Sequence, residues 1–271
     1  MTQPIHLSPI DRRITALLLT SIGGFVDAVG WIALLQVFTA NMSGNSIHLG
    51  MAVGNLDFFL LRRFLCAIAA YIVGLVLTRA TLEIAARVGL RRIASITFSV
   101  EIVLLLLFVQ VSAPLRDGHI ADQTTLLYLG MVVMLAFAMG IQTGTLTHLG
   151  PLTVYTTFVT GTLTKTAESF TRAMFWIHDT RKSATPWSDI WRGLRSHPDG
   201  FATAFLSGVW LCYVAGAALG TAALRTWELR AVYFPIAILC CLVLLDLVRP
   251  IAFEEEQEQH GGGKPQPTGP E

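Results

Sequence analysis

Long runs of apolar residues follow one another along this chain, separated by short polar segments. Six of the runs approach the roughly 20 residues that a helix needs to cross a hydrocarbon core about 30 Å thick. They cover residues 14–36, 64–84, 93–114, 125–147, 201–224 and 231–247. Backbone groups in lipid must be hydrogen-bonded within the spanning structure, so an open chain crosses a bilayer as helices. The pattern therefore predicts an all-α, polytopic membrane protein with six long spans.

Two shorter segments, 41–55 and 154–177, are also predicted to be helical, but they are more polar than the six runs. The first contains Asn41, Ser43, Asn45, His48 and Asn55, and the second contains Lys165, Glu168 and Arg172. Polar groups cannot face lipid, so a short polar helix that enters the membrane has to lie inside the protein. We therefore expect two shorter polar motif helices, which have to be enclosed by protein if they enter the membrane. The pattern leaves open whether they cross the membrane.

Both segments begin at a copy of the same motif. Residues 38–45 read Phe-Thr-Ala-Asn-Met-Ser-Gly-Asn, and residues 155–162 read Tyr-Thr-Thr-Phe-Val-Thr-Gly-Thr. A later apolar run in each half also carries Tyr-x-x-Gly, at Tyr71 and Gly74 and again at Tyr213 and Gly216. The sequence thus predicts internally duplicated halves, residues 14–114 and 125–250. Duplicated halves around small polar motifs are typical of membrane transporters and channels.

The number of spans per half decides the symmetry of the molecule. Three spans per half, with re-entrant motif helices, place the second half upside down relative to the first, whereas four place both halves the same way up. With six spans and a cytoplasmic amino terminus, most basic residues fall inside, as the positive-inside rule requires. Those left outside are Arg62, Arg63, Arg116, Arg225 and Arg230. The charge distribution therefore favours inverted halves over parallel halves with eight spans.

Composition agrees with a membrane protein, because 53% of the 271 residues are hydrophobic and only 14% are charged. Such a chain is too apolar for an ordinary soluble domain. We expect residues 1–13 to be a cytoplasmic amino terminus, and residues 251–271, an acidic segment rich in Gly and Pro, to be a disordered cytoplasmic tail. The basic segment 179–199 contains Trp187 and Trp191. It suits either the lipid headgroup level or a solvated loop in which both tryptophans are buried.

The first span contains a carboxylate, Asp27, just after a pair of glycines. An ionised group near the bilayer centre costs about 3 kcal/mol on insertion scales, so Asp27 should face the protein interior, be paired or be protonated. One interpretation is a proton or cation site, and the other is a carboxyl that caps or orients a neighbouring helix. Overlaying the halves on the motif places Asp27 opposite Gly144 and close to Gln142. The duplicated site is then charged in one half and neutral in the other.

The pairs Ser43-Gly44 and Thr160-Gly161 are natural helix starts, because hydroxyl residues cap helices and Gly lets another backbone or a ligand come close. Free N–H groups at such starts favour negative or electronegative atoms, as in the broken helices of transporters. The candidate substrate-binding residues are therefore Asp27, Asn41, Ser43, Gly44, Asn45, Gln142, Thr160, Gly161, Thr162 and Lys165. The alternative is close helix packing through the two glycines, with hydroxyls bonding across helices.

Other polar groups in the apolar runs are expected to have structural roles. Glu101 is expected to form an ion pair, and its candidate partners are Arg91, Arg92 and Lys165. Asp246 is expected to be an anchor near the inner membrane interface. No His or Cys stands at ligand spacing, so no metal site is expected. Enzyme motifs and a phosphate-binding loop are missing, which argues against an enzyme and against an ATP-driven pump.

The motifs also resemble those of a known family. Gly-Gly-x-x-Asp-Ala in the first span, Ser-Gly-Asn at residues 43–45, and Gly-x-Gln followed by Thr-Gly-Thr in the second half are similar to the YoaK-like family of bacterial inner-membrane proteins of unknown function. That family has Thr where this chain has Ser43, which keeps the hydroxyl. The resemblance covers nearly the whole membrane part. It implies a membrane protein with six or seven spans, and it implies no activity or substrate.

The leading hypothesis is a secondary transporter or exporter of a small solute in the bacterial cytoplasmic (inner) membrane, with both termini cytoplasmic and Asp27 as its ionisable centre. Its expected partners are the lipid bilayer, a small solute and protons, with no nucleic acid and no cofactor. The alternative is a non-transporting membrane scaffold or stress-related assembly protein, in which the same residues only pack. The sequence lacks the nucleophile and base that an intramembrane enzyme would need.

Overall fold

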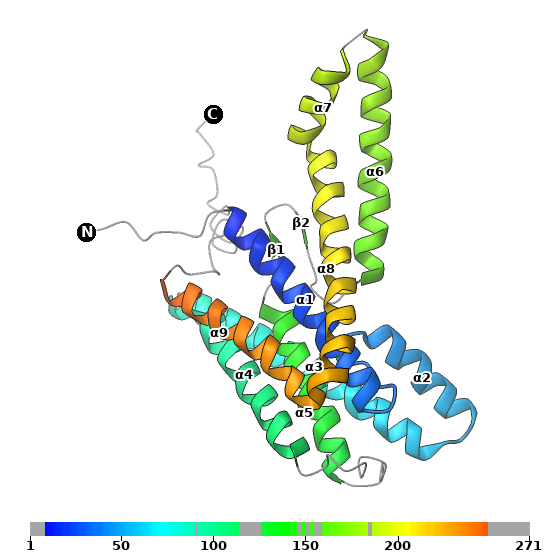
Figure 1. The fold of residues 1–271 in the computed structure, drawn as a ribbon, viewed down its shortest axis with the longest axis vertical. Coiled ribbons are helices and arrows are strands. Elements are labelled where there is room, and N and C mark those ends of the chain that lie inside the picture. Colours follow the sequence, from blue (N-terminus) through cyan, green and yellow to red (C-terminus); the bar gives the residue numbers. More distant parts are fainter. Residues whose placement is uncertain are drawn as a thin grey trace, which may run out of the picture.

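The computed structural model describes residues 9–89, 92–113, 126–145, 148–149, 152–153, 159–183 and 186–248. It is built from helices, apart from one short antiparallel hairpin (Figure 1). The first half contains α1 (Pro9–Ala33), α2 (Met42–Gly54), α3 (Phe58–Val88) and α4 (Ile93–Ser112). The second half contains α5 (Leu126–Thr145), the strands β1 (His148–Leu149) and β2 (Leu152–Thr153), α6 (Val159–Lys182), α7 (Trp187–Ser196), α8 (Pro198–Trp227), the 3-10 helix η3 (Glu228–Val232) and α9 (Tyr233–Val248).

Five helical segments among the described residues are long and apolar enough to cross a membrane. They are Arg12–Ala33, Phe58–Ala85, Ile93–Ser112, Leu126–Thr145 and Pro198–Val248. The predicted class, a polytopic helical membrane protein, is therefore confirmed. The fifth and sixth predicted spans lie together in the last segment, where η3 joins α8 to α9. With 16 residues, α9 is about 24 Å long, which is shorter than a bilayer core.

Helices α1 and α8 pack closely because α8 has glycines where the two backbones meet. A Cβ atom added to Gly216 would overlap the carbonyl oxygen of Ser21. One added to Gly220 would lie 2.7 Å from the carbonyl oxygen of Phe25. A step of one turn along α8 thus corresponds to a step of one turn in the same direction along α1, so the two helices are parallel. Small residues at such crossings are typical of helix pairs in membranes.

The same kind of contact joins α3 and α5. A Cβ atom at Gly140 would overlap the carbonyl oxygen of Tyr71, and one at Gly144 would lie 2.7 Å from the Cβ atom of Thr78. Later residues on α5 again meet later residues on α3, so these helices are also parallel. In both pairs a helix of one half packs against a helix of the other half.

Helices α1 and α5 run in opposite directions. The Tyr128 hydroxyl, near the start of α5, donates to the carbonyl oxygen of Leu34, just past the end of α1, at 2.8 Å. Gln142, near the end of α5, donates from Nε2 to the carbonyl oxygen of Leu19, in the first half of α1, at 2.7 Å. These two bonds define an antiparallel pair.

Helices α4 and α9 are antiparallel as well. Oδ2 of Asp246, near the end of α9, accepts hydrogen bonds from the backbone N–H of Ser95, at 2.8 Å, and from the Ser95 hydroxyl. Ser95 lies in the first turn of α4, where backbone N–H groups have no partner within the helix. The side chain of Asp246 is fully buried and joins the end of α9 to the start of α4, and its expected position near the inner membrane interface stays a prediction.

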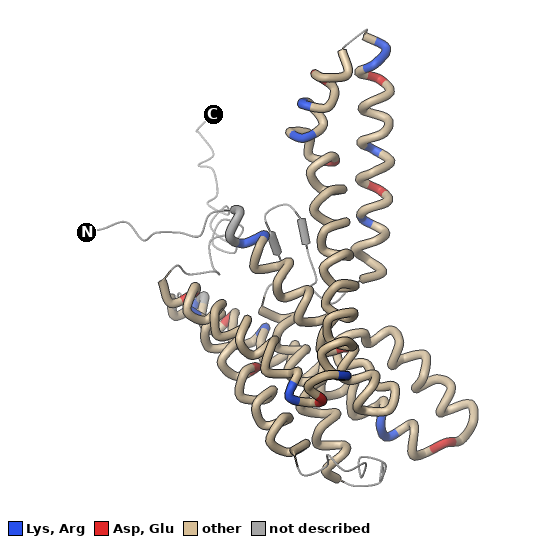
Figure 2. Tube along the Cα trace, viewed as in Figure 1, with Lys and Arg blue, Asp and Glu red and all other residues tan. Residues whose placement is uncertain are grey.

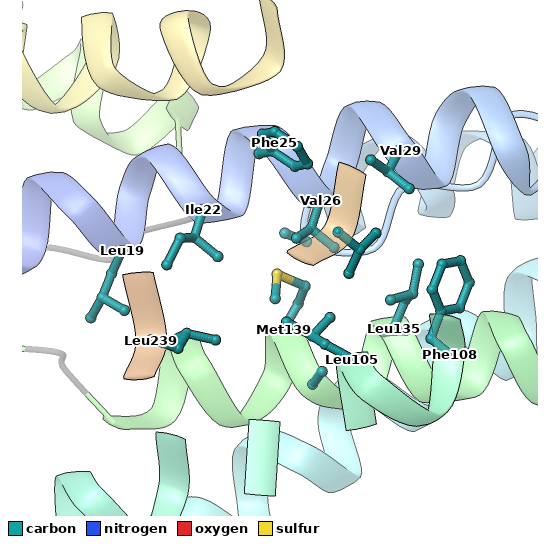
Figure 3. Close-up of a cluster of buried hydrophobic side chains, with 14 of the residues drawn as sticks. Leu19, Ile22, Phe25, Val26, Val29, Leu105, Phe108, Leu135, Met139 and Leu239 are labelled. Carbon is teal, nitrogen blue, oxygen red and sulfur yellow. The ribbon is translucent and has the colours of Figure 1, made fainter. Parts of the chain in front are cut away.

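The core where α1, α4, α5 and α9 meet is apolar (Figure 3). Leu19 and Ile22 of α1, Leu105 of α4, Met139 of α5 and Leu239 of α9 are all buried in this cluster. The side chains come from both halves of the sequence, so each half covers apolar surface of the other. The two halves therefore share one apolar core.

The two motif helices lie outside this core. Helix α2 packs against α3, and its side chains Ile47, Met51 and Val53 are more than half exposed. This position is possible because polar groups of α2 bond locally; the Ser46 hydroxyl, for example, donates to the carbonyl oxygen of Met42. Helix α6 packs against α8 and forms, with α7 and the first part of α8, an arm that extends away from the other helices (Figure 1).

The basic segment 179–199 contains helix α7 rather than only a loop. Trp187 and Trp191 are 51% and 59% exposed, and the Arg181 guanidinium lies 4.8 Å from the centre of a Trp187 ring. The interpretation as a loop with two buried tryptophans is therefore wrong. Lys, Arg, Asp and Glu recur along this arm, whereas long stretches of the other helices carry none (Figure 2). The predicted tail, 251–271, lies outside the described residues.

Gly140→Ala should destabilise the protein, because the new methyl group would overlap the backbone of Tyr71. We expect a loss of about 1–3 kcal/mol in the free energy of unfolding, the usual cost of overpacking. Gly130→Ala on the same helix is the matched control, since a Cβ atom there meets nothing within 4 Å. Denaturant unfolding of both variants in detergent measures the difference. Equal stability of the two variants would contradict the close crossing of α3 and α5.

Candidate functional site

Asp27 of α1 is 3% exposed and accepts several hydrogen bonds from the segment that connects α1 to α2. Its Oδ1 atom accepts from the backbone N–H of Thr39 at 2.7 Å and from that of Ala40 at 2.6 Å. The Thr39 hydroxyl donates to the same oxygen at 3.1 Å, and the Asn41 N–H donates at 3.4 Å. Hydrogen bonds to an ionised carboxylate are about twice as strong as neutral ones, so Asp27 holds this segment firmly.

The connecting segment reaches Asp27 by folding back along α1. The chain turns at Leu35 and Gln36, whose φ angles of 53° and 69° lie in the left-handed region. Gly30 leaves room for the returning chain, because a Cβ atom there would lie 2.6 Å from Cγ2 of Thr39. Asp27 is six residues before the end of α1. The start of α2 therefore lies beside α1, about 9 Å back from its end, rather than beyond it.

Tyr213 of α8 binds the other carboxylate oxygen, because its hydroxyl donates to Oδ2 of Asp27. Both oxygens of Asp27 thus have protein donors, one set from the first half and one from the second. The sequence-based list of site residues did not include Tyr213. A signal was present in the repeated Tyr-x-x-Gly pattern: Gly216 lets α8 approach α1, and Tyr213, one turn earlier on α8, then reaches Asp27.

The remaining residues of the first motif close the turn before α2. The backbone N–H of Phe38 donates to Oδ1 of Asn45 at 3.0 Å, and Nδ2 of Asn45 donates to the Phe38 carbonyl oxygen at 2.6 Å. Gly44 lies against the Phe38 ring, where a Cβ atom would come within 2.7 Å of ring carbons. The Trp31 ring stacks on Phe38 at a centroid distance of 4.5 Å. The aromatic, Gly and Asn positions of the motif therefore have structural roles.

Asn41 caps the start of α2. Its side-chain oxygen accepts from the Gly44 N–H at 3.4 Å and from the Ser43 hydroxyl at 2.7 Å. The sequence favoured Ser43 as the start of the helix, but Ser43 lies within the first turn and its hydroxyl bonds to the capping residue. The difference arises because an Asn side chain is at least as good a cap as Ser and is better placed here.

These contacts place the Asp27 carboxylate beside the start of α2, where helix N–H groups carry partial positive charge. One of the two interpretations that the sequence allowed was a carboxyl that orients a neighbouring helix. The hydrogen bonds from residues 39–41 to Asp27 match this interpretation. In this conformation a cation or solute at Asp27 would have to displace Tyr213 or the N–H groups of the connecting segment.

The candidate residues of the second half lie on other elements. Gln142 of α5 is fully buried and binds α1 through the Leu19 carbonyl oxygen. The residues from the second motif stand on the first turns of α6, where Thr162 is buried, Gly161 is half-buried, and Thr160 and Lys165 are exposed. Among the described residues, α6 packs against α8 and α7, whereas α2 packs against α3. The two motif helices are therefore not joined into one cluster, and residues 154–158 lie outside the described residues.

A cavity of about 540 Å³ lies between α1, α8 and the start of α9. Its walls are apolar and include Ile22, Phe25, Leu219 and Phe234. Gly216 of the Tyr-x-x-Gly pattern lines this cavity, whereas Asp27 and the described residues of the segments 38–45 and 155–162 do not. Within the described part of the chain, no group of three His, Cys, Asp or Glu side chains is placed to hold a metal ion.

The expected ion pair of Glu101 on α4 is not seen among the described residues. Glu101 is fully buried, and neither carboxylate oxygen has a hydrogen-bond partner in this part of the chain. Of the expected partners, Arg92 and Lys165 are exposed, and Arg91 lies outside the described residues. Glu101 lies on the packed side of α4, and its pairing with Arg91 stays a prediction.

The comparisons with known proteins agree with the resemblance in the motifs. A family model described as protein of unknown function (DUF1275) matches residues 15–245. The UPF0700 transmembrane protein YoaK of Bacillus subtilis (strain 168) is 28% identical over 158 residues, which cover 58% of this chain and 67% of that protein. No solved structure matches the chain. The chain is therefore a multi-pass member, embedded in the lipid bilayer, of the DUF1275 family of proteins of unknown function.

Proposed function

We propose that this protein is a secondary transporter or exporter of a small solute, built from two inverted halves with six spans and re-entrant motif helices. In this proposal it lies in the bacterial inner membrane with both termini in the cytoplasm, uses no cofactor and catalyses no reaction. The observation that carries the proposal is the opposite direction of corresponding helices in the two halves.

The corresponding helices are identified by the repeated motif. Helices α1 and α5, which precede the two copies, are antiparallel, and so are α4 and α9, which end the two halves. With four spans per half, each of these pairs would cross the membrane in the same direction. The geometry therefore supports three spans per half, and inverted repeats of this kind are common in secondary transporters.

The start of α2 is a second support. It lies beside α1 at the level of Asp27, so the chain turns back before it enters α2. In secondary transporters, broken helices that start within the membrane hold the solute at their N-termini. We assign the solute contacts to the starts of α2 and α6 and to one residue of α5, although this conformation does not join them into one cluster. The assigned residues are Asn41, Ser43, Gly44, Asn45, Gln142, Thr160, Gly161, Thr162 and Lys165.

Asp27 then acts as a joint between the halves. Its Oδ1 atom holds the connecting segment before α2, and its Oδ2 atom holds Tyr213 of α8. A movement of α8 relative to α1 would break the Tyr213 bond and free one oxygen of the carboxylate. In this proposal, the binding of a solute or proton by Asp27 is thereby linked to the relative position of the halves.

A non-transporting membrane scaffold is the second candidate function. The closed set of hydrogen bonds around Asp27 favours it, because a fully bonded carboxylate in a packed site needs no ligand. The two candidates differ in one property that can be measured without knowing the solute. A transporter must expose its binding region alternately to both sides of the membrane, whereas a scaffold has no such requirement.

The topology is tested with single cysteines in a background without the native ones, at Asn55, Arg92 and Ser183. A membrane-impermeant maleimide is applied to either side of sealed vesicles. Six spans place Arg92→Cys and Ser183→Cys on one side and Asn55→Cys on the other, because α3 then crosses between positions 55 and 92. Labelling of Asn55→Cys and Ser183→Cys from the same side would instead indicate eight spans.

Alternating access is tested at Ser43→Cys, at the start of α2, with Ser188→Cys on α7 as the control for vesicle integrity. We expect a small, membrane-impermeant thiol reagent to modify Ser43→Cys from either side of the membrane, more slowly from one side. Ser188→Cys should react from one side only. Modification of Ser43→Cys from a single side, or from neither, would count against a transporter and for the scaffold.

A further inference from the structure

Glu101 of α4 and Asp27 of α1 are both buried carboxyl groups, but their surroundings are opposite. Asp27 accepts hydrogen bonds at both oxygens, whereas Oε1 and Oε2 of Glu101 have no partner among the described residues. Oε1 of Gln142, on the neighbouring helix α5, is also buried without a donor. These three atoms are acceptors, and the part of the chain that the structure describes supplies no donor for them.

Glu101 belongs to the most closely packed face of α4. Phe98, Glu101, Leu105 and Phe108 follow one another at helical spacing on this face, and each is 0% exposed. Leu105, one turn after Glu101, lies in the apolar cluster with Met139 of α5 (Figure 3). The carboxyl group therefore projects from a face that is otherwise covered by apolar side chains of the other helices.

No titratable side chain in the described parts of α3, α5, η3 and α9 forms a hydrogen bond with Glu101. Tyr128 of α5 bonds to Leu34 near the start of α5, and Asp246 of α9 binds Ser95, almost two turns before Glu101. Leu82 and Ala85 of α3 lie in one cluster with Ile93 of α4, and Glu83 of α3 pairs with Arg87. The other ionisable side chains of α3 are Arg62, Arg63, Cys66, Tyr71 and Arg79. The other ionisable side chains of η3 and α9 are exposed; they are Glu228, Arg230, Tyr233, Cys240 and Cys241.

An ionised carboxylate in these surroundings would lose its hydration without gaining a donor or a counter-charge. The neutral acid avoids this cost and also gains a donor, because its hydroxyl can bond to an acceptor. Asp27 has the donors that an anion needs, and Glu101 has none. Ionisable groups within membrane spans are rare, and those that face the protein interior mark proton or ion pathways.

We infer that Glu101 is a proton-binding site in the helical core and, if the proposed transport function holds, the group that couples solute movement to protons. In the conformation described here, the Glu101 carboxyl group is protonated and neutral. The proton leaves an Oε atom for a water molecule when a shift of α4 against α5 or α9 admits water to the carboxyl, and it returns when the helices close. Asp27 remains the joint between the halves and Glu101 carries the exchangeable proton.

Infrared spectroscopy of the full-length protein in lipid bilayers tests this inference. We expect a C=O stretching band of a protonated carboxylic acid in the wild type at neutral pH, its loss in Glu101→Gln, and its retention in the matched control Glu83→Gln, whose side chain is exposed on α3. Transfer to D2O should shift the band as the proton exchanges. A wild-type spectrum without this band, or a band that Glu101→Gln leaves intact, would overturn the inference. A band that does not shift in D2O would overturn the exchange.

A second measurement uses the wild-type protein, so its result does not depend on whether a variant folds. Dicyclohexylcarbodiimide is an apolar reagent that modifies protonated carboxyl groups in apolar surroundings, and mass spectrometry of the wild type identifies the modified residue. We expect modification of the peptide that contains Glu101 and little at the exposed Glu83. Modification at Glu83 without modification at Glu101 would contradict a protonated core carboxyl.

The failure of this inference and that of the transport proposal are distinguishable. If Glu101 is protonated and exchanges, but Ser43→Cys reacts from one side only, the proton site stands and transport is excluded. If Ser43→Cys reacts from both sides but the infrared band is absent, transport stands and Glu101 is not its coupling group.

Discussion

Asp27 places a carboxylate inside an apolar helix, where an unpaired charge costs about 3 kcal/mol. The protein offsets this cost with donors from two directions: backbone N–H groups of the segment before α2, and the hydroxyl of Tyr213 on α8. The same bonds fix where α2 starts and how α8 lies on α1. One donor set comes from each half of the chain, so the hydrogen bonds of the Asp27 carboxylate form only when the two halves are packed together.

The glycine contacts make this arrangement possible. Gly30 admits the returning chain, and Gly216 and Gly220 let α8 come close enough to α1 for Tyr213 to reach the carboxylate. In the other parallel pair, Gly140 gives α5 the same close approach to α3. Lipid supplies no hydrophobic force between helices, so such close backbone contacts and a few interhelical hydrogen bonds stabilise the packing.

The positions of the helices followed from the apolar runs, because an apolar segment of about 20 residues has one open-chain solution in lipid. The apolar runs did not indicate which helices pack against one another. The bond from Tyr213 to Asp27 joins residues 186 positions apart, and it depends on a helix crossing that no local pattern encodes. Glu101 was assigned an ion pair by charge alone, which does not tell which face of α4 is buried. Nor did the sequence indicate that α2 packs on α3 outside the core, with its polar groups satisfied within its own loop and first turn.

The central claim is that Asp27 joins the two halves through Tyr213, and a double-mutant cycle tests it most directly. The free energy of unfolding is measured in detergent for the wild type, Asp27→Asn, Tyr213→Phe and the double variant. The account predicts that both single changes destabilise the protein and that the double change costs less than their sum, with a coupling energy of about 1 kcal/mol. Additive effects would mean that the two side chains do not interact, and they would contradict the account.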